Sequence, residues 1–238
     1  MNAFLYSVGL HLKLNLRNKE IVVTYYVVPL VFYLFMGNIF TTIIPDAYQT
    51  LIQSMVIFGV TMGGVLGSPA PLVTIFGSEI KKSFRAGDIP LWTVILSNFL
   101  SAFIHLFVMS LIIFFTAPFL FGAAMPGNMY SYFLSLILLL AANLSIGIVF
   151  GVFVKNASKL ALFTQFVFLP SVMLSGIMFS TSLLPDGLKY FGKVFPASWS
   201  YLGMCDKNFT PKYLLPNLLI IAILLVITYF QLKKIQDE

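Results

Sequence analysis

The chain has 238 residues, of which 59% are hydrophobic and only 9% are charged. A water-soluble domain of this size needs more polar side chains to cover its surface, so the composition excludes a soluble globule. The formal net charge of +6 does not indicate nucleic-acid binding, because the lysines and arginines flank apolar segments and form no single patch with interleaved aromatic residues. The composition is that of a protein embedded in a lipid bilayer.

Six long apolar segments follow one another along the chain. About 20 helical residues cross a hydrocarbon core of ~30 Å, and these segments reach that length. Their apolar residues are continuous rather than alternating, which excludes the strands of a membrane β-barrel. The sequence therefore predicts an all-α membrane protein of one transmembrane domain, residues 1–238, with six transmembrane helices. The expected helices cover residues 21–41, 51–76, 92–121, 130–154, 160–181 and 213–232.

Lysines and arginines are concentrated in alternate gaps between these segments. Ten of the 14 lie before the first segment or shortly after the second, the fourth and the sixth. Basic residues beside a span resist translocation, so we expect these gaps and both termini in the cytoplasm. The first apolar segment is too long for the core of a signal peptide, and no small-residue cleavage site follows it, which predicts a signal anchor.

No motif for chemistry within the membrane is present. The sequence lacks a His-Glu-x-x-His zinc motif, and its two histidines, His11 and His105, are too few for an ordinary metal site. Residues 187–193 have the glycine and lysine spacing of a phosphate loop, but Val194 replaces the hydroxyl that would bind magnesium. A short amphipathic helix at the membrane interface explains that stretch better. We expect no catalytic residue, no metal and no cofactor in this chain.

Polar side chains inside the segments have two interpretations. His105 at membrane depth is either a functional ionisable group or a neutral group bonded to a neighbouring helix, and the second interpretation is the simpler one. Asn98, Asn143, Gln53 and Gln165 are expected to form hydrogen bonds between helices in the same way. No carboxylate lies deep in any segment, which argues against coupling to protons or sodium ions.

Glycines recur at every fourth position in two segments: Gly59, Gly63 and Gly67 in the second, and Gly147 and Gly151 in the fourth. This spacing produces a flat helix face that lets a second helix approach closely, so helix packing is their expected role.

Prolines remove backbone donors from two segments. Pro69 and Pro71 predict a kink late in the second helix, and Pro170 predicts one in the fifth.

Three stretches outside the apolar segments are informative. Residues 1–20 carry a moderate amphipathic pattern that predicts a helix at the inner interface. Residues 77–90 contain charges of both signs around Ile80 and Phe84, an i, i+4 pair that either docks on a partner or belongs to an ordinary solvated loop. Residues 182–212, with their prolines and amphipathic pieces, predict partial re-entry into the membrane surface rather than a folded external domain.

Particular residues carry a family resemblance. Residues 169–179 (LPSVMLSGIMF), Leu184-Pro185 and residues 195–199 (FPASW) look like the fifth span and outer re-entrant helices of the type-2 ATP-binding-cassette exporter family. Residues 79–90 are similar to that family's first cytoplasmic loop. The chain therefore resembles the membrane-spanning permease subunit of such an exporter over essentially its whole length.

The resemblance implies an architecture and a set of partners. It implies an elbow helix in residues 1–20, short outer re-entrant helices in residues 182–212, and a multi-pass location in the bacterial cell (inner) membrane. Two nucleotide-binding ATPase subunits would hold the ATP and magnesium. A second permease, identical or related, would complete the transporter, in contact with membrane lipid and not with nucleic acid.

Segment 77–90 would by this resemblance be a coupling helix seated in a groove of the ATPase, with a lesser contact from Lys155 to Lys159. The candidate coupling residues are Glu79, Ile80, Lys81, Lys82, Phe84, Arg85 and Asp88.

The expected function is export of an amphipathic or lipid-like substrate, such as a drug, a peptide, a lipid or a glycan. The aromatic content of 16% motivates this expectation, with Phe166, Phe168 and Met173 as candidates to line the path. Two alternatives remain: an ATP-independent carrier or channel, which the absence of buried carboxylates disfavours, and a non-transporting scaffold or immunity protein.

Overall fold

The computed structural model describes residues 3–43, 46–78, 80, 84, 87 and 90–237. In these ranges every regular element is helical and no β-strand occurs. Six helical stretches of the described chain are long and apolar enough to cross a membrane, which confirms the expected number. They are Lys19–Ile43, Leu51–Phe76, Leu91–Phe121, Met129–Phe153, Ala157–Leu174 and Pro211–Ile235.

Two of the six spans contain an interruption and four are mainly single helices. The first span comprises α2 (Lys19–Val22), a π-helical turn (Val23–Val27) and α3 (Val28–Ile43). The second comprises α4 (Leu51–Thr61), a π-helical turn (Met62–Gly67) and α5 (Pro69–Phe76). The other spans are formed by α7 (Leu91–Phe121), α8 (Met129–Phe153), α9 (Ala157–Leu174) and α12 (Leu215–Asp237). Outside them lie α1 (Ala3–Arg17), α10 (Asp186–Gly192) and α11 (Pro196–Cys205).

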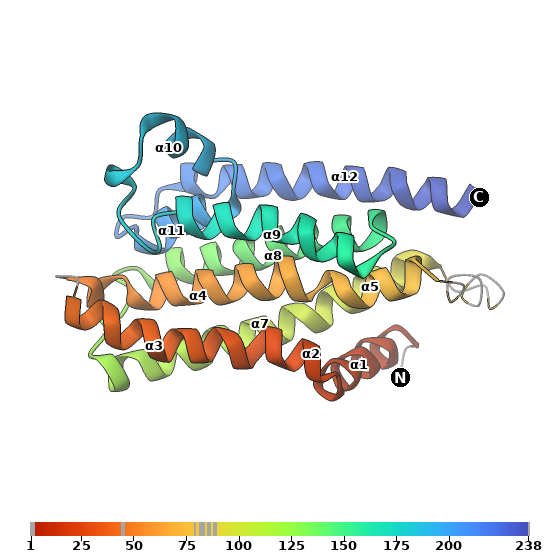
Figure 1. Ribbon diagram of the computed structural model, residues 1–238, viewed down its shortest axis with the longest axis horizontal. Helices are drawn as coiled ribbons and strands as arrows, with labels where there is room; N and C mark the ends of the chain where they lie inside the picture. Colours follow the sequence, from red (N-terminus) through yellow and green to blue (C-terminus); the bar gives the residue numbers. More distant parts are fainter. Residues whose placement is uncertain are drawn as a thin grey trace.

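The second span is the centre of the bundle. All side chains of α4 are buried, and α4 contacts α3, α7, α8, α9 and α11. Figure 1 shows α4 and α5 running between α3 on one side and α9 with α8 on the other, while α12 lies at the edge. Most of the outward side chains of the peripheral spans are apolar, as expected for helices surrounded by lipid.

The fifth span ends earlier than the expected range 160–181. Helix α9 stops at Leu174, and residues 175–179 form bends. Gly176 has a φ of +93°, which no right-handed helix contains. The Ser175 hydroxyl donates a hydrogen bond of 3.0 Å to the Val172 carbonyl and so satisfies one acceptor of the last helical turn. Pro170, where the sequence predicts a kink, lies within α9, which continues to Leu174.

The irregularity of the second span lies just before its prolines. Pro69 has no amide hydrogen, and its ring disfavours a regular helix on its N-terminal side. The chain adapts with a π-helical turn, in which the Ser68 amide donates to the Gly63 carbonyl at 2.9 Å. The Ser68 hydroxyl also donates to the Gly64 carbonyl at 2.6 Å, so the disturbed turn keeps its acceptors paired. The π-helical turns of the first and second spans contact each other.

Helix α1 is held against the third span by polar contacts. The Asn15 amide donates to the Ser101 hydroxyl at 2.8 Å, and the Ser97 hydroxyl donates to Ser7 at 3.0 Å. Asn15 is almost completely buried, so the first hydrogen bond is shielded from water. These contacts fix the position of α1 on α7.

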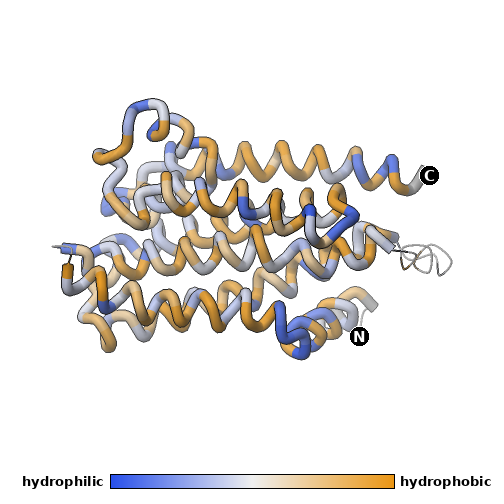
Figure 2. Tube along the Cα trace, in the orientation of Figure 1, coloured by the Kyte–Doolittle hydropathy of each residue, from blue (hydrophilic) through white to orange (hydrophobic). Residues whose placement is uncertain are grey.

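The two ends of the bundle differ in what they contain. Both chain termini, the last turn of α5 and the first turn of α9 lie at one end, here named the terminal end (Figure 1). Helix α10 and the start of α4 lie at the other, here named the opposite end. Hydrophilic residues gather at these ends, and the tube between them is mainly apolar (Figure 2).

The glycines of the fourth span face the second span at very short range. A Cβ atom on Gly147 would collide with the Ser68 hydroxyl and the Gly64 carbonyl, and one on Gly151 would lie 2.6 Å from the Leu72 Cβ. The three regularly spaced glycines of the second span meet the first and third spans instead: Gly67 faces Tyr25, and Gly59 and Gly63 face the third span. Side chains at these positions would separate the helices.

We expect Gly147→Ala to destabilise the protein by about 1–3 kcal/mol, because the added methyl meets backbone atoms that cannot rotate away. Thermal unfolding of the purified protein in detergent measures the effect. Gly9→Ala is the matched control, since nothing lies within 4 Å of its added methyl. Equal unfolding temperatures for the two variants would contradict the tight contact between the second and fourth spans.

Candidate functional site

The terminal end contains a separate apolar cluster. Residues from the second, third, fourth and sixth spans form it: Leu72, Phe76, Leu91, Ile95, Ile148, Val152 and Ile235. Phe84, from the segment between α5 and α7, packs against this cluster. The segment is therefore attached by an aromatic side chain to helices that run through the whole bundle.

The candidate coupling residues fall into two groups. Glu79, Lys81, Lys82, Arg85 and Asp88 lie outside the described residues. Ile80 and Phe84 are described, and they differ, because Phe84 is half-buried against the cluster and Ile80 is 44% exposed. Ile80 thus presents an apolar side chain that the described chain does not cover.

The chain turn between the fourth and fifth spans lies beside this segment. A Cβ atom on Gly77 would lie 2.8 Å from the Lys155 carbonyl oxygen, so the two connections touch. Asn156 caps helix α9 by accepting hydrogen bonds from the amides of Ser158 (2.8 Å) and Lys159 (3.3 Å). The structure thereby brings the two stretches named as coupling contacts together at one end.

The three candidate path residues do not share one surface. Phe168 is buried, and its ring packs edge-to-face on Phe58 at a centroid distance of 5.8 Å, within the main core. Phe166 and Met173 are 76% and 51% exposed on the outer face of α9. Residues two apart on a helix point in nearly opposite directions, which explains why Phe166 and Phe168 separate.

His105 forms the hydrogen bonds to neighbouring helices that its simpler interpretation requires. Its Nδ1 lies 2.8 Å from the Tyr26 hydroxyl, and its Nε2 lies 3.3 Å from the Leu12 carbonyl oxygen. Because a carbonyl only accepts, Nε2 carries a hydrogen, and in the neutral ring Nδ1 then accepts from the Tyr26 hydroxyl. His105 thus links α1, the first span and the third span.

Of the four amide side chains expected to form hydrogen bonds between helices, two do so in the structure. Asn98 donates to the Ser68 carbonyl at 3.1 Å and Asn143 donates to Thr61 at 3.4 Å, both across helices. Gln53 is buried, yet its Oε1 has no hydrogen-bond partner among the described residues. Gln165 is exposed on α9 and so is not shared between helices of this chain.

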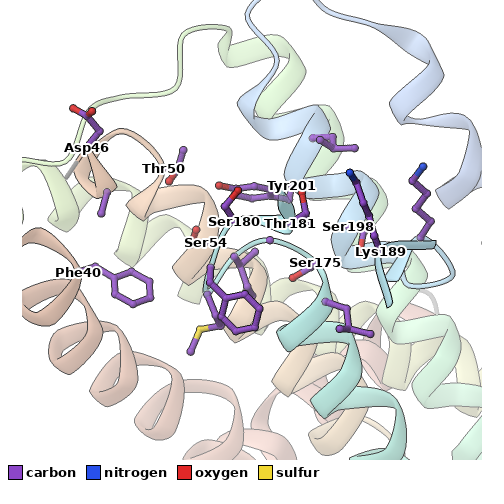
Figure 3. Close-up of a pocket in the computed structure, with 18 residues that line it drawn as sticks. Phe40, Asp46, Thr50, Ser54, Ser175, Ser180, Thr181, Lys189, Ser198 and Tyr201 are labelled. Atoms are coloured by element: carbon purple, nitrogen blue, oxygen red, sulfur yellow. The ribbon is translucent and has the colours of Figure 1, made fainter. Parts of the chain in front are cut away.

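A cavity of about 420 Å³ opens at the opposite end of the bundle. Its wall combines the end of α3, the turn before α4, the start of α4, the segment after α9, and helices α10 and α11. Figure 3 shows Asp46 on one side of it and Lys189 on the other, with Tyr201, Ser180 and Thr181 between them. The lining residues are Phe40, Asp46, Ala47, Thr50, Ser54, Leu174, Ser175, Gly176, Ile177, Met178, Phe179, Ser180, Thr181, Lys189, Lys193, Ser198, Tyr201 and Leu202.

The hydroxyl of Tyr201 is a neutral donor in this cavity. Burial raises the pKa of Tyr201, and its hydroxyl also interacts with the side chains of Thr50, Ser54 and Cys205. Burial likewise raises the pKa of the Cys205 thiol to about 12, so near pH 7 the thiol is protonated and unreactive. The cysteine therefore acts as a small packing residue.

Comparison with known families identifies the chain. A model of the ABC-2 type transporter family matches residues 4–207. The chain belongs to the ABC-2 type transporter family. A search of curated proteins found no match. With its six membrane-spanning helices, this ABC-2 protein is an integral, multi-pass membrane permease subunit of an ABC transporter, and the membrane domain is not itself an ATPase.

Sequence reasoning missed the cavity of the ABC-2 protein. Its wall collects residues from position 40 to position 202, and no local pattern connects them. Two signals were present: Lys189 and Lys193 lie four residues apart in the sequence, and Gly176 interrupts an apolar run. Neither one indicates a cavity without the packing of α10 and α11 around it.

We expect Phe168→Ala to destabilise the ABC-2 protein by about 2 kcal/mol, below the usual cost in a water-soluble core because lipid is itself apolar. Phe166→Ala on the same helix serves as the control and should leave the unfolding temperature of the monomeric subunit unchanged. Thermal unfolding in detergent compares them. A larger loss for Phe166→Ala would contradict the placement of Phe168 in the core.

Proposed function

We propose that this chain is the membrane subunit of an ATP-driven exporter that moves an amphipathic or lipid-like substrate out of the cytoplasm. Separate ATPase subunits bind and hydrolyse ATP with magnesium, and this chain contributes the path and the coupling contact. The observation that carries the proposal is the ABC-2 family match together with the connection of segment 77–90 to the helices at the terminal end.

The terminal end is the cytoplasmic end in this proposal. In the sequence, ten of the 14 lysines and arginines precede the first span or follow the second, fourth and sixth spans, and the described ends of α5 and α12 and the start of α1 lie at that end. Basic residues beside spans stay in the cytoplasm. Helix α1, which carries Lys13 and Arg17 and is anchored on α7, serves as the elbow at the inner interface. Helices α10 and α11 then form the outer re-entrant region.

The coupling step follows from the contacts of Phe84. When the ATPase subunits close on ATP, they push on segment 77–90, and Phe84 passes the displacement to the cluster that includes Leu72 and Ile148. The second span is central and contacts most of the other spans, so its tilt rearranges the bundle. The exposed Ile80 is suited to fill an apolar groove of the ATPase.

Substituting Ile80 tests this coupling contact. We expect Ile80→Glu to reduce the amount of ATPase that co-purifies with the tagged subunit about tenfold, since a carboxylate in an apolar groove costs more than 1.4 kcal/mol. Met125→Glu is the matched control: Met125 is 45% exposed and Ile80 is 44% exposed, but Met125 lies in the connection between α7 and α8.

Both variants are scored after equal membrane insertion. Retention of a stoichiometric ATPase by Ile80→Glu, or failure of the unsubstituted chain to retain any ATPase, would reject the coupling role of the segment.

The partner in the membrane is, in this proposal, a second copy of the permease. Gln165 lies at the middle of α9 and is exposed, and a side-chain amide facing lipid lacks hydrogen-bond partners. The same face carries Phe166 and Met173, so it combines a polar group with large apolar side chains. A second copy packed on this face would pair the amide and enclose a path between the two subunits.

Cysteine cross-linking tests the pairing of α9. On a Cys205→Ser background, Gln165→Cys should form a disulfide-linked dimer in membranes under mild oxidation, because the two helices would approach along this face. Phe230→Cys on α12, whose native side chain is 64% exposed, is the control and should stay monomeric. Equal cross-linking at both positions would indicate random collision and contradict the dimer face.

A further inference from the structure

Several residues that line the cavity at the opposite end have backbone amides without a hydrogen-bond partner among the described residues. Residues 175–180 leave helix α9 and form one part of its wall. Among the described residues, no acceptor receives a hydrogen bond from the amides of residues 176–180. An unpaired amide is costly away from bulk water, so these donors require either water or a ligand.

The chain leaves α9 through two successive residues of opposite backbone hand. Ser175 is right-handed, with φ −76° and ψ −17°, and Gly176 follows with φ +93°. A right-handed residue followed by a left-handed one forms a concave arrangement of successive amides, which binds anions. Only glycine adopts this φ without strain.

Two lysines stand on the wall contributed by α10. Lys189 lies in α10 and Lys193 directly follows its last residue, Gly192, and both lysines belong to the lining of the cavity. Of the described lining residues, Asp46 alone carries a carboxylate, and it lies across the cavity from Lys189 (Figure 3). Its Oδ1 accepts a hydrogen bond of 3.2 Å from the Gln49 side chain. The cavity therefore has an excess of positive charge.

Two helices begin at the cavity and add to this field. Thr50 and Ser54 come from the start of α4, and Ser198 comes from the first turn of α11. The N-terminus of a helix carries a partial positive charge and unpaired amides, so the N-termini of α4 and α11 each favour an anion. The protonated Tyr201 hydroxyl supplies a further donor.

Apolar side chains complete the wall. Phe40, Ile177, Met178 and Phe179 lie in the same lining as the donors. A small inorganic anion would leave this apolar surface uncovered, whereas a molecule with an anionic head and an apolar tail would cover both kinds of surface.

We propose that the cavity binds the anionic head group, a phosphate or a carboxylate, of an amphipathic molecule. The amides after Ser175 and the two lysines bind the head, and the apolar wall contacts the start of the tail. Binding at this cavity does not depend on the proposed function. If that function holds, the cavity is the outer exit site and the cargo is an anionic amphiphile, and this consequence rests on the proposed function.

Binding of dodecyl phosphate to the purified, delipidated full-length chain in neutral detergent tests the site. We expect Lys189→Gln/Lys193→Gln to weaken binding about tenfold or more, because two charge-assisted contacts are lost. Lys207→Gln/Lys212→Gln removes the same charge from the same connection but from residues that do not line the cavity, and binding should change less than about twofold.

A second pair of variants examines the backbone amides. Gly176→Ala should also weaken binding, because alanine at φ +93° is strained and its Cβ would lie 3.1 Å from Thr181. Gly187→Ala is the control, since nothing lies within 4 Å of its added Cβ.

Several outcomes would overturn the proposal. Equal loss of binding in the two double-lysine variants would show that overall surface charge, and not the cavity, causes the effect. Tight binding of dodecylphosphocholine would show that the site does not require a net anionic head. Displacement of dodecyl phosphate by an equal concentration of inorganic phosphate would assign the site to a soluble anion and reject the amphiphile. Phosphatidylglycerol that co-purifies with the unsubstituted chain and is lost in Lys189→Gln/Lys193→Gln would support the proposal with a bilayer lipid as the occupant.

These measurements need no ATPase subunit. A negative result for anion binding therefore does not affect the interpretation of the Ile80→Glu experiment. A negative result for Ile80→Glu likewise does not affect the anion site.

Discussion

The pairing of backbone hydrogen bonds within lipid is the constraint on which the rest of this structure depends. Hydrocarbon offers no partner for an amide or a carbonyl, so the described chain crosses the membrane only as helices. At Pro69 the regular helical hydrogen bonds are interrupted. A π-helical turn and the Ser68 hydroxyl provide hydrogen bonds for the Gly63 and Gly64 carbonyls there. After Leu174 the helix ends, and the amides of residues 176–180 have no acceptor among the described residues at the place where the cavity lies. The deviations from regular helix therefore occur at a packing centre and at a candidate binding site.

Close packing and buried polar contacts hold the helices in register, because apolar contact alone gives little preference for one helix over lipid. The glycines of the fourth span allow the second span to approach at backbone distance. Asn98, Asn143 and His105 then join particular pairs of helices through hydrogen bonds. A bundle held in this way transmits a displacement of the second span to its neighbours, since that span contacts most of them.

The two ends of the protein carry different chemistry. The terminal end has an apolar cluster with Phe84 packed on it and Ile80 exposed beside it, which suits contact with another protein. The opposite end has hydroxyls, lysines and unpaired amides around a cavity, which suits a small charged group. The helices that connect these ends are mainly apolar and carry no deep carboxylate in the described chain.

Hydropathy along the chain predicts the six helices that the described residues contain, and glycine spacing predicts helix faces that allow close approach. The cytoplasmic side of the basic flanks stays a prediction. Hydropathy, charge and four-residue spacing are local properties, so they can be read along the chain without knowledge of the fold. The position of His105 within an apolar segment predicts a hydrogen bond to a neighbouring helix, but only the structure identifies Tyr26 and Leu12 as the partners. Tertiary structure alone decided that Phe168 enters the core while Phe166 faces outward, that Gln165 has no partner within the described chain, and that α9 ends at Leu174. It also formed the cavity, because that wall depends on how α10 and α11 pack over the ends of three spans, and packing between segments so far apart leaves no periodic trace in the sequence.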